Sequence, residues 1–100
     1  ASPMLNINAT KNESTLSLVL DGRLDTVTAP ELQAAIDEQI DGVSNIVMDC
    51  KDLAYISSAG LRVLLTARKS IQGDLILNNV TPSVQDVLEI TGFVDILTIE

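Results

Sequence analysis

Two adjacent hydroxyls, Ser57 and Ser58, are the residues best placed for chemistry, because they precede an apolar segment with helical spacing. Serine is favoured just before a helix, since its side-chain oxygen accepts from a backbone N–H that has no partner within the helix. The same helix end attracts negative charge, so a phosphate would be electrostatically favoured there. The spacing alone favours a plain cap at Ser58 over a regulated phosphorylation site, and it leaves Ser57 open as a turn former or a second cap.

Two carboxylates and one guanidinium are candidates to act beside these hydroxyls. Asp49 is expected to end a buried strand and Asp25 to follow another, so both carboxylates can reach the sheet edge that carries the serines. There they would accept hydrogen bonds or help to position a metal–nucleotide complex brought by a partner. Equally, they are solubilising charges at strand ends. Arg62, one turn into the helix, either steadies a phosphate or is solvated, and the solvated interpretation is favoured.

Catalytic groups are scarce in this chain. Histidine is absent, so the commonest general base near neutral pH is missing and a Ser-His-Asp arrangement cannot be built. A small hydrolase that uses Ser57 or Ser58 would lack its base. The sequence also contains no Cys/His cluster for zinc, no calcium-loop spacing of carboxylates and no glycine-rich phosphate loop with its lysine. We therefore expect a protein that is not an enzyme and needs no metal or cofactor.

The composition is acidic, with six basic residues against fourteen acidic ones and a formal net charge of -8. This charge disfavours a phosphate backbone, so direct nucleic-acid binding is not expected. Cys50 is the single cysteine and is expected to be a buried structural thiol. No apolar stretch has membrane-spanning length and no basic-then-apolar leader is present, which predicts a soluble, cytoplasmic protein.

One hundred residues indicate a single domain over 1–100, in which Ala1–Pro3, ahead of Met4, is expected to be an expression remnant. Alternating apolar residues over 5–9 and 16–20 predict a hairpin whose second strand ends at Asp21-Gly22.

The first helix is predicted to begin at Thr28 as cap, with Pro30 in its first turn and Glu31 at capping-box spacing. Its stop is expected at Gly42. The apolar stripe of this helix comprises Leu32, Ala35, Ile36 and Ile40.

The second half of the chain alternates strands and helices. Strands are predicted over 45–50, buried on both faces, and over 74–77 and 94–99. One helix is predicted after Ser58, with Arg68 and Lys69 near its end and Gly73 as its stop. Its apolar face comprises Leu61, Leu64, Leu65 and Ile71. Another helix is predicted to begin at Thr81-Pro82-Ser83 and to stop at Gly92, with Val84, Val87 and Leu88 inward. The resulting order, β-β-α-β-α-β-α-β, predicts an α/β fold with a mixed sheet, an N-terminal hairpin and helices packed on the sheet.

Three stretches of this sequence carry a resemblance to a known family. Residues 52–61 read Asp-Leu-Ala-Tyr-Ile-Ser-Ser-Ala-Gly-Leu; Gly22-Arg23-Leu24-Asp25 with Ala29-Pro30 precede them, and Thr91-Gly92-Phe93-Val94-Asp95-Ile96 follow. Together they resemble the anti-sigma-factor antagonists, the bacterial STAS domains, over nearly the whole chain.

The resemblance implies a protein that regulates transcription by partner switching. In its unphosphorylated form such an antagonist binds an anti-sigma factor that is itself an ATP-dependent serine kinase, which frees the sigma factor. The kinase phosphorylates the serine that corresponds to Ser58, the antagonist is released, and a serine phosphatase resets it. The partner-binding residues expected on this basis are Asp25, Asp49, Ser57, Ser58, Ala59, Gly60 and Arg62.

The sequence departs from the family pattern in two places. Many members carry Asp immediately before the phosphorylated serine, whereas this chain has Ser57, which becomes an alternative acceptor. Many relatives also have a further helix after the last strand, which is absent here or lies outside the sequence. The alternative function is a STAS binding subunit of a transport or stress-signalling assembly, in which Ser58 is only a helix cap.

Overall fold

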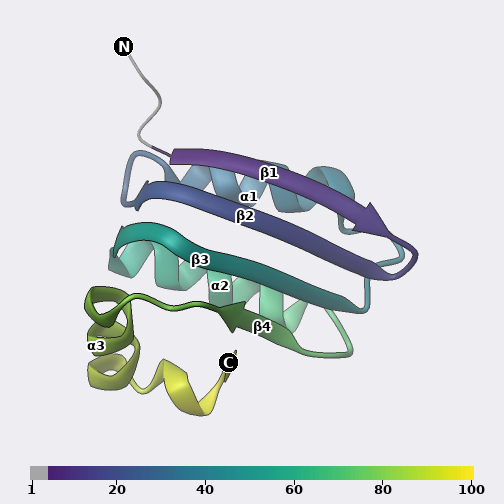
Figure 1. Ribbon diagram of the computed structural model, residues 1–100. Coiled ribbons are helices and arrows are strands. Elements are labelled where there is room, and N and C mark those ends of the chain that lie inside the picture. Colours follow the sequence, from purple (N-terminus) through teal and green to yellow (C-terminus); the bar gives the residue numbers. More distant parts are fainter. Residues whose placement is uncertain (1–4) are drawn as a thin grey trace.

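The computed structural model describes residues 5–100, which form a five-stranded sheet with three α-helices (Figure 1). Its elements are β1 (Leu5–Asn12), β2 (Thr15–Leu24), α1 (Ala29–Gln39), β3 (Asn45–Ile56), α2 (Ser58–Lys69), β4 (Leu75–Asn78), α3 (Pro82–Thr91), the 3-10 turn η1 (Phe93–Asp95) and β5 (Thr98–Ile99). The predicted order of strands and helices is confirmed. The expected remnant, Ala1–Pro3, lies outside the described residues.

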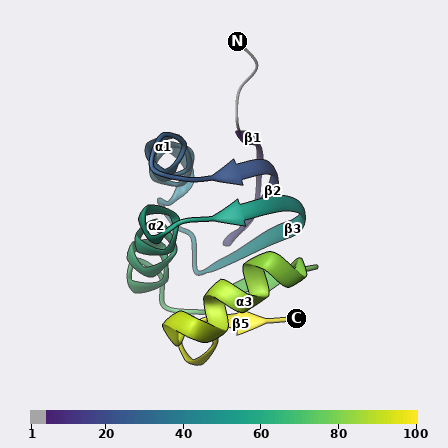
Figure 2. The same cartoon turned by 90° about the vertical axis from the view of Figure 1, so that its left-hand side faces the viewer.

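The sheet has the strand order β1-β2-β3-β4-β5. β1 and β2 are antiparallel, and the remaining neighbours are parallel, which confirms the mixed sheet. α1 and α2 lie side by side on one face, and α3 lies at the end of the sheet where β3 finishes (Figures 1 and 2). The carboxyl ends of β2 and β3 and the first turns of α1 and α2 therefore meet at one end of the molecule.

β2 is longer than the sequence pattern predicts. Leu16, Leu18 and Leu20 are buried as expected, but the strand continues past Asp21-Gly22 to Leu24. Gly22 has a φ of 126°, a conformation in which side chains other than hydrogen are strained, and it still pairs with β1 and β3. The glycine thus keeps the strand going where it was expected to end it.

β3 also continues well beyond the predicted end at Cys50. Its pairing with β2 is irregular in two places, and at each of them β3 has one residue more than β2. Each extra residue shifts the alternation of buried and exposed side chains by one position. The buried side chains of β3 are Ile46, Met48, Cys50, Leu53 and Ile56.

β3 lies in the middle of the sheet, as its apolar sequence predicts, but it is not buried on both faces. Val47 and Asp49, which alternate with the buried residues, are only half-buried. The reason is that α1 and α2 cover the other face of this part of the sheet (Figure 2).

α2 ends at Lys69, with Ser70 as its C-cap, so Gly73 does not terminate it. Gly73 instead lies against the start of β3, where a Cβ atom would be 2.6 Å from the carbonyl oxygen of Ser44 and would also clash with Oδ1 of Asn45. Its missing side chain allows this contact. The C-terminal cationic residues of α2, Arg68 and Lys69, are placed as predicted.

α3 ends at Gly92, whose φ of 81° confirms its role as a left-handed C-cap. The strand predicted over 94–99 is mostly wrong, because only Thr98–Ile99 pair with β4. The backbone N–H groups of Asp95 and Ile96 donate to Gly92 and Phe93 in a tight turn instead of to a neighbouring strand.

The core between the sheet and the helices is almost entirely aliphatic. Its largest fully buried side chains are Leu16, Leu18, Leu20, Leu24, Leu32, Ile36, Ile46, Met48, Leu53, Leu64, Leu75 and Leu77. Within residues 5–100, no helix is both long and apolar enough to cross a membrane.

Candidate functional site at the start of α2

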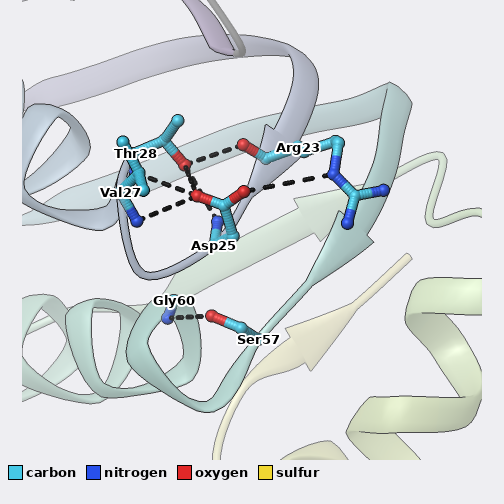
Figure 3. Close-up of polar contacts among 6 residues, drawn as sticks. All are labelled: Arg23, Asp25, Val27, Thr28, Ser57 and Gly60. Carbon is cyan, nitrogen blue, oxygen red and sulfur yellow. Dashed lines mark hydrogen bonds and ion pairs between the residues drawn. The ribbon is translucent and has the colours of Figure 1, made fainter.

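The ends of β2 and β3 are joined by a backbone hydrogen bond, in which Ser57 N–H donates to the carbonyl oxygen of Leu24 at 2.9 Å. Asp25 follows Leu24 directly, and Ser58 follows Ser57 as the first residue of α2. The turn before α1 and the turn before α2 therefore lie beside one another (Figure 3). The expectation that Asp25 and the two serines share one end of the sheet is correct.

Ser57, not Ser58, is the N-cap of α2. Ser57 has an extended backbone, and its Oγ accepts from Gly60 N–H at 3.4 Å. Ser58 already has a helical backbone and is exposed, and its hydroxyl makes no hydrogen bond to any of residues 5–100. The interpretation of Ser58 as a plain cap is wrong, because a cap needs the non-helical backbone that Ser57 supplies.

Gly60 is buried and allows the first turn of α2 to approach the sheet. A Cβ atom on Gly60 would lie 2.7 Å from Cγ of Leu24 and 3.0 Å from Cγ1 of Ile56. The absence of a side chain at Gly60 therefore lets α2 begin close to the ends of β2 and β3. Its expected role as a partner contact stays a prediction. Ala59, beside it, is half-buried and lies nearer the surface.

The carboxylate of Asp25 organises its own turn. Its Oδ1 accepts from the backbone N–H groups of Val27 at 3.0 Å and Thr28 at 3.1 Å. The hydrogen bond from Thr28 N–H is the main reason that the pKa of Asp25 lies below its ordinary value. Asp25 is therefore a fixed negative charge next to the Ser57–Ser58 turn.

The buried side chain of Thr28 stabilises the same turn. Its hydroxyl donates to the carbonyl oxygen of Arg23 at 2.7 Å and accepts from Asp25 N–H at 2.9 Å. Because the hydroxyl is used in this way, it makes no cap hydrogen bond to α1. The predicted capping box with Glu31 does not form.

Arg23 and Tyr55 form a contact that the sequence reasoning missed. The guanidinium carbon of Arg23 lies 4.4 Å from the centre of the Tyr55 ring, and its Nε lies 4.0 Å from Oδ2 of Asp25. The extra residue in β3 places Arg23 opposite Tyr55. Both residues lie within the motifs quoted above, so a correct strand register would have revealed the pair.

Asp49 is not part of this site. It lies in the middle of β3, seven residues before the end of the strand at Ile56, which is about 23 Å at roughly 3.3 Å per residue. Its Oδ1 accepts from Lys51 N–H at 3.0 Å and from Nδ2 of Asn79 at 3.2 Å, and these hydrogen bonds lower the pKa of Asp49. The expectation that Asp49 ends a strand beside Ser58 is wrong, because the strand continues past it.

A groove of about 350 Å³ runs between α1 and α2 from the Ser58 turn. Its lining residues are Thr26, Ala29, Pro30, Gln33, Ala59, Arg62, Val63 and Thr66. Arg62 is exposed on the α2 side. An exposed hydroxyl, a fixed carboxylate and a shallow groove are thus contiguous at this end of the molecule.

Comparison with known proteins identifies the family of this chain. The family model for the STAS domain matches residues 6–100. The chain belongs to the STAS domain family. Within it, the chain groups with the anti-sigma-factor antagonists, as its sequence motifs predict.

Two relatives of this STAS domain match over nearly their whole length. BtrV of Bordetella bronchiseptica is 36% identical over 99 residues, which cover 95% of this chain and 85% of that protein. The anti-sigma-B factor antagonist of Bacillus subtilis is 26% identical over 98 residues, covering 95% and 90% of the two chains.

Solved structures of anti-sigma factor antagonists share the fold described above. An anti-sigma factor antagonist from Mycobacterium paratuberculosis superposes with a TM-score of 0.84 at 20% identity, over 95% of this chain and 84% of that one. The anti-sigma factor antagonist SpoIIAA in its unphosphorylated form gives a TM-score of 0.83 at 22% identity, over 95% and 88%.

Cys50 of this STAS domain is buried under the sheet, and burial raises the pKa of its thiol to about 12. A thiol that keeps its proton is a poor nucleophile, so Cys50 acts as a small core side chain, as predicted. Ser58, by contrast, is exposed at the start of α2.

Proposed function

We propose that this protein is an anti-sigma-factor antagonist controlled by phosphorylation of Ser58. In its unphosphorylated form it binds an anti-sigma factor that is also a serine kinase. Phosphorylation of Ser58 by that kinase releases the protein, and a serine phosphatase restores the binding form. The switch would operate in the cytoplasm, where the kinase has ATP.

The observation that carries this proposal is that Ser57 and Ser58 have different positions in the structure. Ser57 caps α2, which leaves the exposed Ser58 hydroxyl without a structural task among residues 5–100. Ser58 can therefore be modified without the loss of a cap. A hydroxyl that a kinase must reach needs this exposure.

The charges around the turn explain why phosphorylation would release a partner. A phosphate adds about 1.5 to 2 negative charges at neutral pH, together with steric bulk. A surface that fits a neutral hydroxyl beside the ionised Asp25 would then meet a second, larger anion. Because the phosphate stands on the first residue of a helix, the fold tolerates it, so the switch acts on binding rather than on folding.

The relatives support the same proposal. SpoIIAA, with which this chain shares its fold, has been solved in an unphosphorylated and a phosphorylated form. The Bacillus subtilis relative is named for its action on an anti-sigma factor. An anti-sigma factor is thus the class of partner that we propose, and the acidic net charge of -8 disfavours direct nucleic-acid binding.

Intact-mass analysis tests the modification itself. The purified protein is incubated with ATP and an extract of its source cells, alongside Ser57→Ala and Ser58→Ala. We expect a single phosphoryl increment that is lost only in Ser58→Ala. An unmodified protein, in an extract that phosphorylates a known substrate, would favour a STAS subunit that binds its partner constitutively. Loss of the increment in Ser57→Ala alone would move the site to Ser57.

A further inference from the structure

Arg62 lies four positions after Ser58 in α2, and both side chains are exposed. Residues four apart are neighbours on a helix surface, with Cβ atoms about 5–6 Å apart. Side chains in a helix also lean toward its N-terminus. The long side chain of Arg62 can therefore reach the turn that carries Ser58.

The guanidinium of Arg62 has no competing partner among residues 5–100. The ion pair within this range joins Arg23 to Asp25, and the hydrogen bond at Arg62 involves only its backbone carbonyl. Arg23, the other arginine at this end, is engaged by both Asp25 and the Tyr55 ring. Arg62 is thus the arginine available to a new anion at Ser58.

We propose that Arg62 holds the phosphate of phosphorylated Ser58 and is thereby withdrawn from the partner surface. The inference rests on the proposed function only in taking Ser58 as the modified residue. A guanidinium matches phosphate oxygens with two parallel hydrogen bonds, and an anion four residues before a cation is the favourable order in a helix.

This contact gives Arg62 two states. In the unphosphorylated protein, Arg62 lines the groove between α1 and α2 and can contact acidic groups of a partner. In the phosphorylated protein, the same guanidinium is paired within its own helix. Phosphorylation would thus remove a cation from the binding surface as well as add an anion to it.

The experiment needs no kinase, because phosphoserine can be incorporated at position 58 during synthesis. The titration of the phosphate is followed by 31P NMR in the otherwise unchanged protein, in Arg62→Gln and in Arg62→Lys. Arg68→Gln is the matched control, since it removes the same charge from the far end of α2. Circular dichroism verifies that each variant is folded.

The charged residues in the segments next to Ser58 are Arg23 near the end of β2, Asp25 just after it, Glu31 in the first turn of α1, and Arg62 in α2. Loss of Arg62 should raise the titration midpoint by roughly 0.15–0.4 pH unit, because a neighbouring cation favours the dianion. Arg68→Gln should leave the midpoint unchanged, and Arg62→Lys should retain part of the effect.

An unchanged midpoint in Arg62→Gln would overturn the proposal, as would a shift seen in Arg23→Gln instead. Both results are independent of the extract experiment above. If the extract leaves Ser58 unmodified but Arg62→Gln shifts the titration, the proposed function fails while the contact stands. If the extract modifies Ser58 but Arg62→Gln does not move the midpoint, the proposed function stands and the contact between Arg62 and the phosphate fails.

Discussion

The backbone N–H of Ser57 donates to the carbonyl oxygen of Leu24 at 2.9 Å, and this bond brings the turn at Asp25 against the turn at Ser58. Leu24 and Ile56 are already paired in the parallel β2–β3 ladder, so this bond extends the pairing into the turn that follows β3. The carboxylate of Asp25 thus lies in the turn next to the one that carries Ser57 (Figure 3), and the exposed Ser58 follows Ser57 directly. A partner that binds across these two turns would contact both at once.

Replacing each serine separately should distinguish their roles. Ser57→Ala removes the N-cap of α2 and should lower the free energy of unfolding by about 0.5–1 kcal/mol, at the low end for caps because the Ser57 Oγ to Gly60 N distance is 3.4 Å. Ser58→Ala should change it by less than about 0.5 kcal/mol. Urea unfolding at neutral pH measures both, and a larger loss in Ser58→Ala would contradict the assignment of the cap.

Gly60→Ala should destabilise the fold although it adds only a methyl group. The new Cβ would lie 2.7 Å from a side-chain carbon of Leu24, so α2 or the end of β2 must move. Overpacking of this kind costs about 1–3 kcal/mol. Urea unfolding should show this loss, with Ser58→Ala on the same turn as the control. A cost below about 0.5 kcal/mol would mean that the first turn of α2 is packed less closely than described.

Thr28→Val should break the turn that positions Asp25. The substitution keeps the side-chain shape but removes the hydroxyl that joins Arg23 and Asp25. The part-buried N–H of Asp25 and carbonyl of Arg23 then lose that partner. The expected loss is about 1–3 kcal/mol, and Thr28→Ser should recover most of it. Thermal or urea unfolding would check that stability falls from the unchanged protein to Thr28→Ser and then to Thr28→Val. Equal stability of the Val and Ser variants would exclude a role for the hydroxyl.

Asp25 should make stability depend on pH in the acidic range. Its folded pKa lies below the ordinary value of 3.8 because Thr28 N–H binds the ionised form. The stabilisation is therefore present above pH 3.8 and is lost as the pH falls through the lower folded pKa. Carboxyl 13C NMR should give a midpoint below 3.8 for Asp25.

The matched variant for this titration is Asp25→Asn, in which the acid-induced loss of stability should be smaller. The dependence of stability on acidic pH that remains in this variant is expected from Asp49, whose pKa is lowered by separate hydrogen bonds. A midpoint for Asp25 at or above 3.8 would contradict the hydrogen bonds to its carboxylate.

The local patterns predicted the order of elements, because alternating Leu residues and helix starts with Thr and Pro are short-range signals. They failed where the backbone departs from regular geometry. The extra residues in β3 disturb the alternation after Cys50, so the strand was ended too early and Asp49 was placed at the wrong position. Residue type alone indicates a stop at Gly22, because the unusual φ with which it continues the strand cannot be read from the sequence.

The candidate site was predicted in its location but not in its contacts. The adjacency of Asp25 and Ser58 follows from parallel strands that end together. Which serine caps α2 depends on where the backbone becomes helical, and such boundaries are uncertain by one or two residues from any pattern. The stacking of Arg23 on Tyr55 depends on the exact strand register, which the sequence reasoning did not have.

The central claim is that phosphorylation of Ser58 controls binding to the kinase that modifies it. That kinase is isolated by following the phosphorylating activity, and its affinity is measured by calorimetry for the unmodified protein and for the protein with phosphoserine incorporated at position 58. Loss of a few kcal/mol at a tight contact predicts affinity at least about 100-fold weaker for the phosphorylated form. Equal affinities for the two forms would contradict the switch.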